Sequence, residues 1–246
     1  RNEVQNNKKY IIDVFIARYE GKSAIDEKFL EDIENGLTFL FQLLEESKFY
    51  EVRMSVNRWL AEGLSKITHI PLDLIAKIEV NFDNTLSEHW TIMNVHSKNS
   101  FAFLYAMSNA LSLRGIYIYG IKTSSVGGDI HDTFLISDRR GYKLEDEHKQ
   151  QTVRNAAVLI KRFTQYLPLA PDPAKAMEHF DRFLDKILDQ DIPDQQSTFL
   201  SFSKKNNLDF LARFFGASDF LWEDFLRVRF DALLPVLEDF NRTGKT

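Results

Sequence analysis

In the middle of the chain, the spacing of apolar residues changes repeatedly between a period of two and a helical period, and this change limits the fold more than any other feature. Apolar residues alternate strictly in Lys77–Phe82, which is typical of a strand with one buried face. The segments His89–His96, Ile116–Thr123 and Asp132–Ile136 are also β-rich. We therefore expect four strands, the last two of which form a hairpin.

Two helical patterns interrupt these strands. After residue 100, Leu104, Met107 and Leu111 share one helix face, and Gly115 follows where a left-handed residue ends a helix. A longer amphipathic pattern covers Glu147–Leu167. The order strand, strand, helix, strand, strand, helix predicts an α+β fold in which helices pack on one face of an antiparallel sheet.

Helical patterns flank this central region on both sides. The N-terminal patterns cover Tyr10–Tyr19, Ile25–Leu44 and Val52–Ile67, and we expect the apolar face of the second to be buried. On the C-terminal side, Asp172 is placed to cap a helix that begins at Pro173. Further helices are predicted over Leu208–Phe215 and from Asp219 to about Asp239. The predicted segments are thus 1–70 (N-terminal helices), 71–167 (sheet and helices) and 168–246 (C-terminal helices).

Composition excludes several classes of function. The net charge is −5 and the isoelectric point is about 5.7, so the chain lacks the basic excess typical of proteins that bind nucleic acid. The absence of cysteine fits a reducing cytoplasm. No apolar run approaches the ~20 residues that cross a bilayer, so we expect a cytoplasmic protein with no membrane partner. The chain begins with Arg1 rather than Met, which suggests a fragment.

Residues typical of catalytic or metal sites occur without the surroundings that such sites need. Asp189-Gln190-Asp191 has no Gly-Ser turn before it, so it does not match the magnesium-binding carboxylates of nucleotidyltransferases. His131-Asp132 is predicted to open a strand, where neighbouring side chains point to opposite faces. The glycine-rich run Ser124–Gly128 lacks the lysine and the helix of a phosphate-binding loop. We predict no catalytic and no metal-binding residues in this chain.

Several segments between residues 74 and 167 resemble the ACT domains of bacterial PII uridylyltransferases: Phe101–Tyr105, Asn109–Leu111, Gly115-Ile116, Ile121–Thr123 and Asp132–Asp138. The run Leu211–Trp222 is similar to the helical region of glutamine synthetase adenylyltransferases. Together these resemblances imply an ACT-like allosteric, regulatory region from a nucleotidyltransferase of nitrogen metabolism. The whole protein would then be a nucleotidyltransferase that uses magnesium in another domain.

The resemblance also implies an effector and partners. The effector would be an amino acid such as glutamine, the ACT-like unit would form a homodimer, and the partner would be glutamine synthetase or a PII-type signal protein. The sensing surface is predicted at the loop of Ser97, Asn99, Ser100 and Phe101, facing Tyr119 and Gly120.

Two alternatives remain open from the sequence. One is a structural or dimerisation module without a ligand, which is favoured because Ser100 stands where amino-acid-binding ACT domains usually carry a glycine. The other is an enzyme whose site is assembled from scattered residues that no linear motif reveals.

Overall fold

The computed structural model describes residues 26–66, 78–98, 101–126, 129–189, 199, 201–220 and 222–223. It divides into two compact units, residues 1–52 and 53–246. The first unit contains helix α1 (Glu27–Glu45), where Asp26 caps the N-terminus by accepting a hydrogen bond from Lys28 N. Helix α2 (Phe49–Ser65) lies mostly in the second unit. The predicted pattern Tyr10–Tyr19 lies outside the described residues.

The apolar face of α1 differs from the expectation. The predicted helix is present, but none of its residues is buried. Leu40 and Leu43 are half-buried. The other large apolar side chains of α1 are between 38% and 60% exposed, namely Phe29, Leu30, Ile33, Leu37, Phe39, Phe41 and Leu44. Helical spacing reports that one face is apolar but not what covers it, so the expected burial is not found among the described residues.

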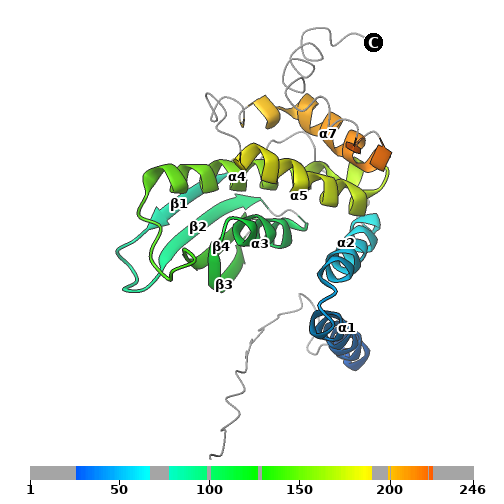
Figure 1. Ribbon diagram of the computed structural model, residues 1–246, viewed down its shortest axis with the longest axis horizontal. Coiled ribbons are helices and arrows are strands. Elements are labelled where there is room, and N and C mark those ends of the chain that lie inside the picture. Colours follow the sequence, from blue (N-terminus) through cyan, green and yellow to red (C-terminus); the bar gives the residue numbers. More distant parts are fainter. Residues whose placement is uncertain are drawn as a thin grey trace, which may run out of the picture. The chain divides into compact units, whose positions relative to one another are not determined.

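The α+β prediction is confirmed by a four-stranded antiparallel sheet in the second unit (Figure 1). The strands are β1 (Glu79–Asp83), β2 (Thr91–Lys98), β3 (Tyr117–Val126) and β4 (Asp129–Ser137), in the order β1-β2-β4-β3. Helix α3 (Phe103–Leu113) connects β2 to β3, and α4 (Glu147–Tyr166) follows β4. The strand-strand-helix order predicted from the apolar periods is therefore correct in both halves.

Both central helices cover the same face of the sheet. Helix α3 contacts β3 and α4 contacts β1. Residues that face these helices alternate along the two central strands and are buried, as in Met93 and Val95 of β2 and in Phe134 and Ile136 of β4. Gly115 ends the α3 region with a φ of 65°, which confirms the left-handed position expected after this helix.

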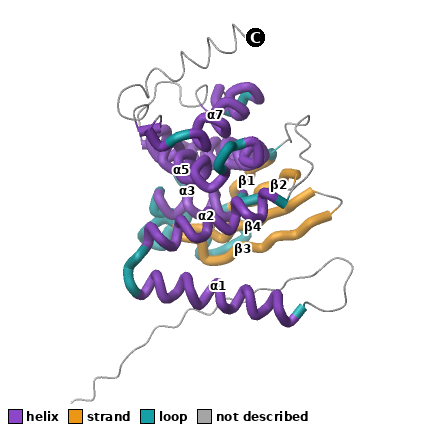
Figure 2. Tube along the Cα trace, turned by 90° about the vertical axis from the view of Figure 1, so that its right-hand side faces the viewer, coloured by secondary structure: helices purple, strands orange, loops and turns teal. Residues whose placement is uncertain are grey.

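Helices α5 (Pro173–Asp189) and α7 (Lys205–Ala217) form a further layer on the same side of the sheet (Figure 2). A 3-10 turn, η1 (Leu167–Leu169), connects α4 to α5. Asp172 accepts a hydrogen bond from Lys175 N at 3.0 Å, which confirms the predicted cap. Helix α5 contacts both α3 and α7, so the sheet layer and the C-terminal helices share one core. The predicted division into segments 1–70, 71–167 and 168–246 stays a prediction.

Candidate functional site

A cavity of about 370 Å³ lies beside the N-terminal end of α3, on the helix-covered side of the sheet. Helices α2, α3 and α4 and strands β3 and β4 all contribute to its walls. Its lining is mainly apolar and aromatic, with two charged side chains: Leu60, Phe101, Ala102, Phe103, Leu104, Tyr105, Thr123, Ile130, Asp132 and Lys161. An apolar pocket of this size with a few polar groups is the usual form of a small-molecule site.

Lys161 is the basic residue of this cavity. It is only 1% exposed, because its spacing from Ala157 and Thr164 places it on the buried face of α4. Its Nζ atom lies 4.0 Å from the centroid of the Phe103 ring, which is a cation–π geometry. Burial lowers the pKa of Lys161 to about 8, and the nearby Asp132 carboxylate opposes that shift. At pH 7 the side chain is therefore still mostly an ammonium.

Asp132 is the acidic residue. It alternates with Phe134 and Ile136 on the helix-facing side of β4 and is 2% exposed. Burial raises its pKa, while the Thr123 hydroxyl and the Lys161 ammonium oppose that shift. Its Oδ1 atom has no hydrogen-bond partner in the part of the chain that the structure describes. A buried carboxylate oxygen without a partner is costly, so its position at a cavity indicates a binding group.

The N-terminal end of α3 completes this polar surface. The first hydrogen bond within the helix runs from Ala106 N to Ala102 O at 3.0 Å, and no side chain caps the helix. The N–H groups of Phe103, Leu104 and Tyr105 therefore have no acceptor inside α3. Since these residues line the cavity, the positive end of the helix dipole lies beside it.

The backbone at Ala102 is strained. Its φ of 63° lies in the left-handed region, which costs a residue with a Cβ atom about 1–2 kcal/mol. Such strain persists where the surrounding structure requires a particular path of the chain. Ala102 lines the cavity, so the strained residue shapes the loop at this site.

Helix α2 contributes Leu60 to the cavity wall and approaches the cavity residue Phe101 at Gly63. A Cβ atom at Gly63 would lie 2.5 Å from the Phe101 ring, so the missing side chain allows α2 to approach that ring closely. Phe101 in turn is 38% exposed, which makes it the most accessible aromatic side chain of the cavity.

The structure brings part of the predicted sensing loop to this cavity. Phe101 lines it, and Ser97 lies on the same face of the sheet, paired with the cavity residue Ile130. Ser97 is 3% exposed, and its Oγ atom has no partner among the described residues. Asn99 and Ser100 lie outside the described residues. The role of this loop in binding stays a prediction.

The two predicted residues on β3 lie elsewhere. Tyr119 is 55% exposed and its ring centroid lies 5.5 Å from that of Trp90. Gly120 follows a register irregularity and pairs with Leu135. Neither residue lines the cavity. The structure therefore does not bring Tyr119 and Gly120 together with Phe101 around one cavity.

Lys161 and Asp132 were missed as site residues, although the sequence carries a signal for each. Lys161 is a charged residue inside the apolar stripe of a helix, and Asp132 occupies an apolar-face position in the alternation toward Phe134 and Ile136. His131 and Asp132 do point to opposite faces, as predicted, because Asp132 is buried and His131 is exposed. What the sequence could not show is that β4 and α4 place Asp132 and Lys161 around the same space.

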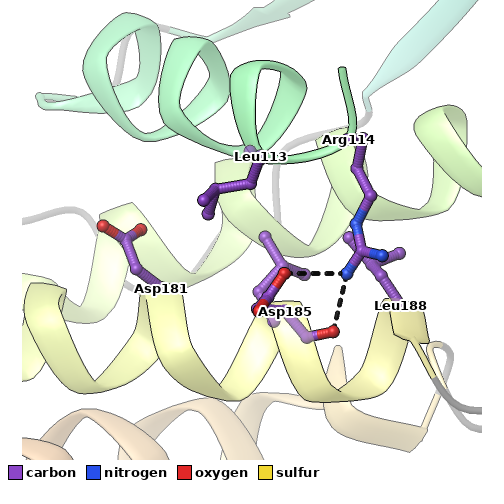
Figure 3. Close-up of a pocket in the computed structure, with 7 residues that line it drawn as sticks. Leu113, Arg114, Asp181, Asp185 and Leu188 are labelled. Atoms are coloured by element: carbon purple, nitrogen blue, oxygen red, sulfur yellow. Dashed lines mark hydrogen bonds and ion pairs between the residues drawn. The ribbon is translucent and has the colours of Figure 1, made fainter. Parts of the chain in front are cut away.

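A second polar cluster fixes α5 against α3 (Figure 3). Arg114, just after α3, donates hydrogen bonds to the Asp185 backbone oxygen at 2.6 Å and to Asp185 Oδ1 at 3.1 Å. One turn earlier in α5, Asp181 accepts a hydrogen bond from Asn109 Nδ2 at 3.3 Å. Asp181 is 4% exposed, and burial raises its pKa to about 7. This cluster is a structural contact between layers rather than an open site.

Histidines and acidic residues do not gather into a metal site in the described residues, where no group of three or more potential ligands could hold an ion. His96 and His131 stack across β2 and β4 with their ring centroids 4.1 Å apart. Sequence spacing could not reveal this pair, because it depends on the strand register that sets His96 opposite His131.

Within the described part of the chain, no helix is both long and apolar enough to cross a membrane.

Comparison with known proteins gives a partial similarity to one class of enzyme. No family model and no solved structure matches the chain. The chain is 31% identical over 74 residues to the bifunctional uridylyltransferase/uridylyl-removing enzyme of Ruegeria pomeroyi and 30% identical over 74 residues to that of Cereibacter sphaeroides. Each alignment covers 30% of this chain and 8% of the relative. About a third of this chain is thus similar to a short part of these much longer enzymes.

Proposed function

We propose that this chain is a regulatory, effector-binding region of a nucleotidyltransferase of nitrogen metabolism. The observation that carries the proposal is the cavity next to Phe101, where a buried lysine and a buried aspartate face the same space. The partial similarity to bifunctional uridylyltransferase/uridylyl-removing enzymes supports the kind of protein to which the region belongs. The effector class is an amino acid, and the ACT resemblance makes glutamine the first one to test.

Other parts of this proposal concern the protein as a whole. Nucleotidyl transfer would take place in a separate domain that uses magnesium, in the cytoplasm. The protein that receives the nucleotide would be glutamine synthetase or a PII-type signal protein. Binding of the effector would favour one of two arrangements of the regulatory region, and it can do so only if the effector binds those two arrangements with different affinities.

The first prediction is that amino acids raise the melting temperature of the 246-residue chain. A ligand that binds the folded state at a hundredfold excess over its Kd adds about 2.7 kcal/mol, which is about 5–10 °C for a chain of this size. The measurement is thermal unfolding with each of the standard amino acids in turn. We expect a selective increase with one chemical class.

Two matched variants control this experiment. Ile130→Trp adds bulk inside the cavity, whereas Ile92→Trp changes a residue on the opposite face of the sheet. The increase in melting temperature should disappear in the first variant and persist in the second. If no amino acid raises the melting temperature of the wild-type chain, the proposal that this region binds an amino-acid effector is wrong.

A structural or dimerisation module is the second candidate, and strand β3 favours it. β3 is an edge strand of the sheet, with Tyr117, Tyr119 and Ile121 between 44% and 55% exposed. Long edge strands with exposed apolar side chains are ready to pair with a second strand. Two copies of the chain could join their sheets through β3 around a twofold axis.

The second prediction concerns this edge. Sedimentation equilibrium should show a dimer of the wild-type chain and a monomer of Tyr119→Glu, because a charge at the centre of the edge would be buried on pairing. Tyr142→Glu is the control, since Tyr142 is 67% exposed and lies outside the strands. A wild-type chain that remains monomeric at high concentration would rule out dimerisation through β3.

A further inference from the structure

The cavity presents two opposite charges, each of which opposes the shift that burial causes in the pKa of the other. Lys161 and Asp132 are 1% and 2% exposed, and Asp132 Oδ1 has no hydrogen-bond partner in the described part of the chain. Buried charges are normally paired, because desolvation of an unpaired ion costs several kcal/mol. An occupant of the cavity that carries both charges would give each of these two side chains an additional partner.

We propose that this cavity binds a small zwitterion with an apolar body, namely a neutral amino acid with an aliphatic or aromatic side chain. Its carboxylate lies at Lys161 and the N-terminal end of α3, and its ammonium lies at Asp132. This inference rests on the proposed function and specifies its effector. It differs from the glutamine suggested by the resemblance, since the cavity favours an apolar side chain.

The carboxylate end is fixed by two independent features. Lys161 supplies an ammonium at the cavity wall, next to the Phe103 ring. The backbone N–H groups at the start of α3 lack acceptors in the helix and lack a side-chain cap. A helix N-terminus together with a cation is a favourable place for a carboxylate.

The ammonium end is fixed by Asp132. Its Oδ1 atom is buried without a hydrogen-bond partner in the described residues, and an alkylammonium is a strong donor for such an oxygen. Thr123 lies opposite Asp132 in the β3–β4 register and adds a hydroxyl to the same wall. The two ends of the zwitterion are thus bound by residues from different layers, the carboxylate by Lys161 of α4 and the ammonium by Asp132 of β4.

The body of the ligand meets apolar groups. Beyond Lys161 and Asp132, no other charged side chain lines the cavity in the described residues. Leu60, Leu104 and Ile130 provide aliphatic surface, and Phe101 provides an aromatic ring. A ligand side chain with a third charge would meet no opposite charge among the described lining residues. A side-chain amide would exchange its hydrogen bonds to water for the few hydroxyl groups of the lining, those of Tyr105 and Thr123.

This inference is tested by titrating amino acids and their analogues into the 246-residue chain and measuring the heat of binding by calorimetry. L-leucine and L-phenylalanine should bind at least about 10-fold more tightly than L-glutamine, L-glutamate or L-lysine. N-acetyl-L-leucine lacks the ammonium and L-leucinamide lacks the carboxylate. Each should bind about 10- to 100-fold more weakly than leucine, because each loses one charge-assisted contact.

Substitutions then assign each end of the ligand to one residue. Lys161→Met should weaken leucine binding about 10- to 100-fold and remove the preference for leucine over leucinamide. Asp132→Asn should also weaken leucine binding about 10- to 100-fold, and it should remove the preference for leucine over N-acetyl-leucine. Lys122→Met is the matched control, since Lys122 is exposed on β3 and lies outside the cavity, and leucine should bind it as it binds the wild type.

The possible outcomes separate this inference from the proposed function. Binding of glutamine in preference to leucine, or leucine binding that is unchanged in Lys161→Met and Asp132→Asn, overturns the inference and leaves an effector-binding region in place. The absence of binding by every amino acid overturns both. Circular dichroism of each variant shows whether it is folded. If a single variant is unfolded, the two ligand analogues still test its end of the site in the wild-type chain.

Discussion

Asp181→Asn is expected to make the folded chain more stable than the wild type by up to about 4 kcal/mol at pH 8, with little difference at pH 4. Asp181 is 4% exposed on α5. Burial raises its pKa from 3.8 to about 7, with Glu178 adding to the shift and Arg53 and Asn109 opposing it. Asparagine keeps the shape of the side chain and can still accept the hydrogen bond from Asn109.

The direction of the pH effect follows from the two states of this carboxyl. Between about pH 4 and pH 7, Asp181 keeps its proton in the folded chain and loses it in the unfolded chain. The folded state then binds more protons, so stability falls as the pH rises through this window and becomes level above the folded pKa. Asparagine does not titrate, so the variant should lack this fall.

Urea unfolding at a series of pH values between 4 and 8 measures the effect. Asp185→Asn is a matched control one turn further along α5, where the carboxyl is 42% exposed and paired with Arg114. That variant should show no gain in stability at pH 8. Equal stabilities of wild type and Asp181→Asn at every pH would mean that the Asp181 carboxyl ionises in the folded chain without a significant cost.

The sheet and its two covering helices could be predicted because burial repeats with a different period in each. In β1, Val80 is buried and Phe82 is half-buried, whereas Glu79 and Asn81 are exposed, and this alternation is visible in the sequence. In α4, Val153, Ala156, Ile160 and Phe163 repeat with the helical period and are buried. Each of these elements can therefore be predicted from the spacing of its own apolar residues, independently of the elements that pack against it.

The cavity could not be predicted in the same way, because it depends on contacts between elements. The sequence places Asp132 on the apolar face of a strand and Lys161 on the apolar face of a helix. It does not show that these two faces meet, or that α2 approaches Phe101 closely at Gly63. The ACT resemblance predicts a sensing loop before α3, and Phe101 of that loop lines the cavity.

The flanking helices also show that contacts between elements cannot be predicted from the sequence of each element alone. Both α1 and α5 are amphipathic, so the sequence predicts a buried apolar face for each helix. In the structure α5 is packed between α3 and α7, and Phe180 and Phe183 are fully buried. No residue of α1 is buried. An apolar face predicts a contact, but the partner that makes the contact is decided by the rest of the fold.

The aromatic contact between α4 and α5 gives the last prediction, which is that Phe180→Ala lowers the free energy of unfolding by about 3–5 kcal/mol. Phe180 is fully buried, and its ring stacks on that of Phe163 with the centroids 3.9 Å apart. Truncation would leave a cavity at the junction of the two layers and remove an aromatic pair that adds about 0.5–1.5 kcal/mol beyond its buried area. For a chain of ordinary stability, this is a large part of the total.

Guanidinium unfolding, followed by far- and near-ultraviolet circular dichroism, measures this effect, with Phe220→Ala as the control because Phe220 is 76% exposed. The control should change stability by less than about 0.5 kcal/mol. Because α5 shares its core with α3 and α4, Phe180→Ala should unfold in one transition shifted to lower denaturant. Two separate transitions, of which only one responds to Phe180→Ala, would instead show that the helices after residue 167 unfold independently of the sheet. In that case the contacts of Arg114 and Asn109 with α5 would be too weak to couple the two layers.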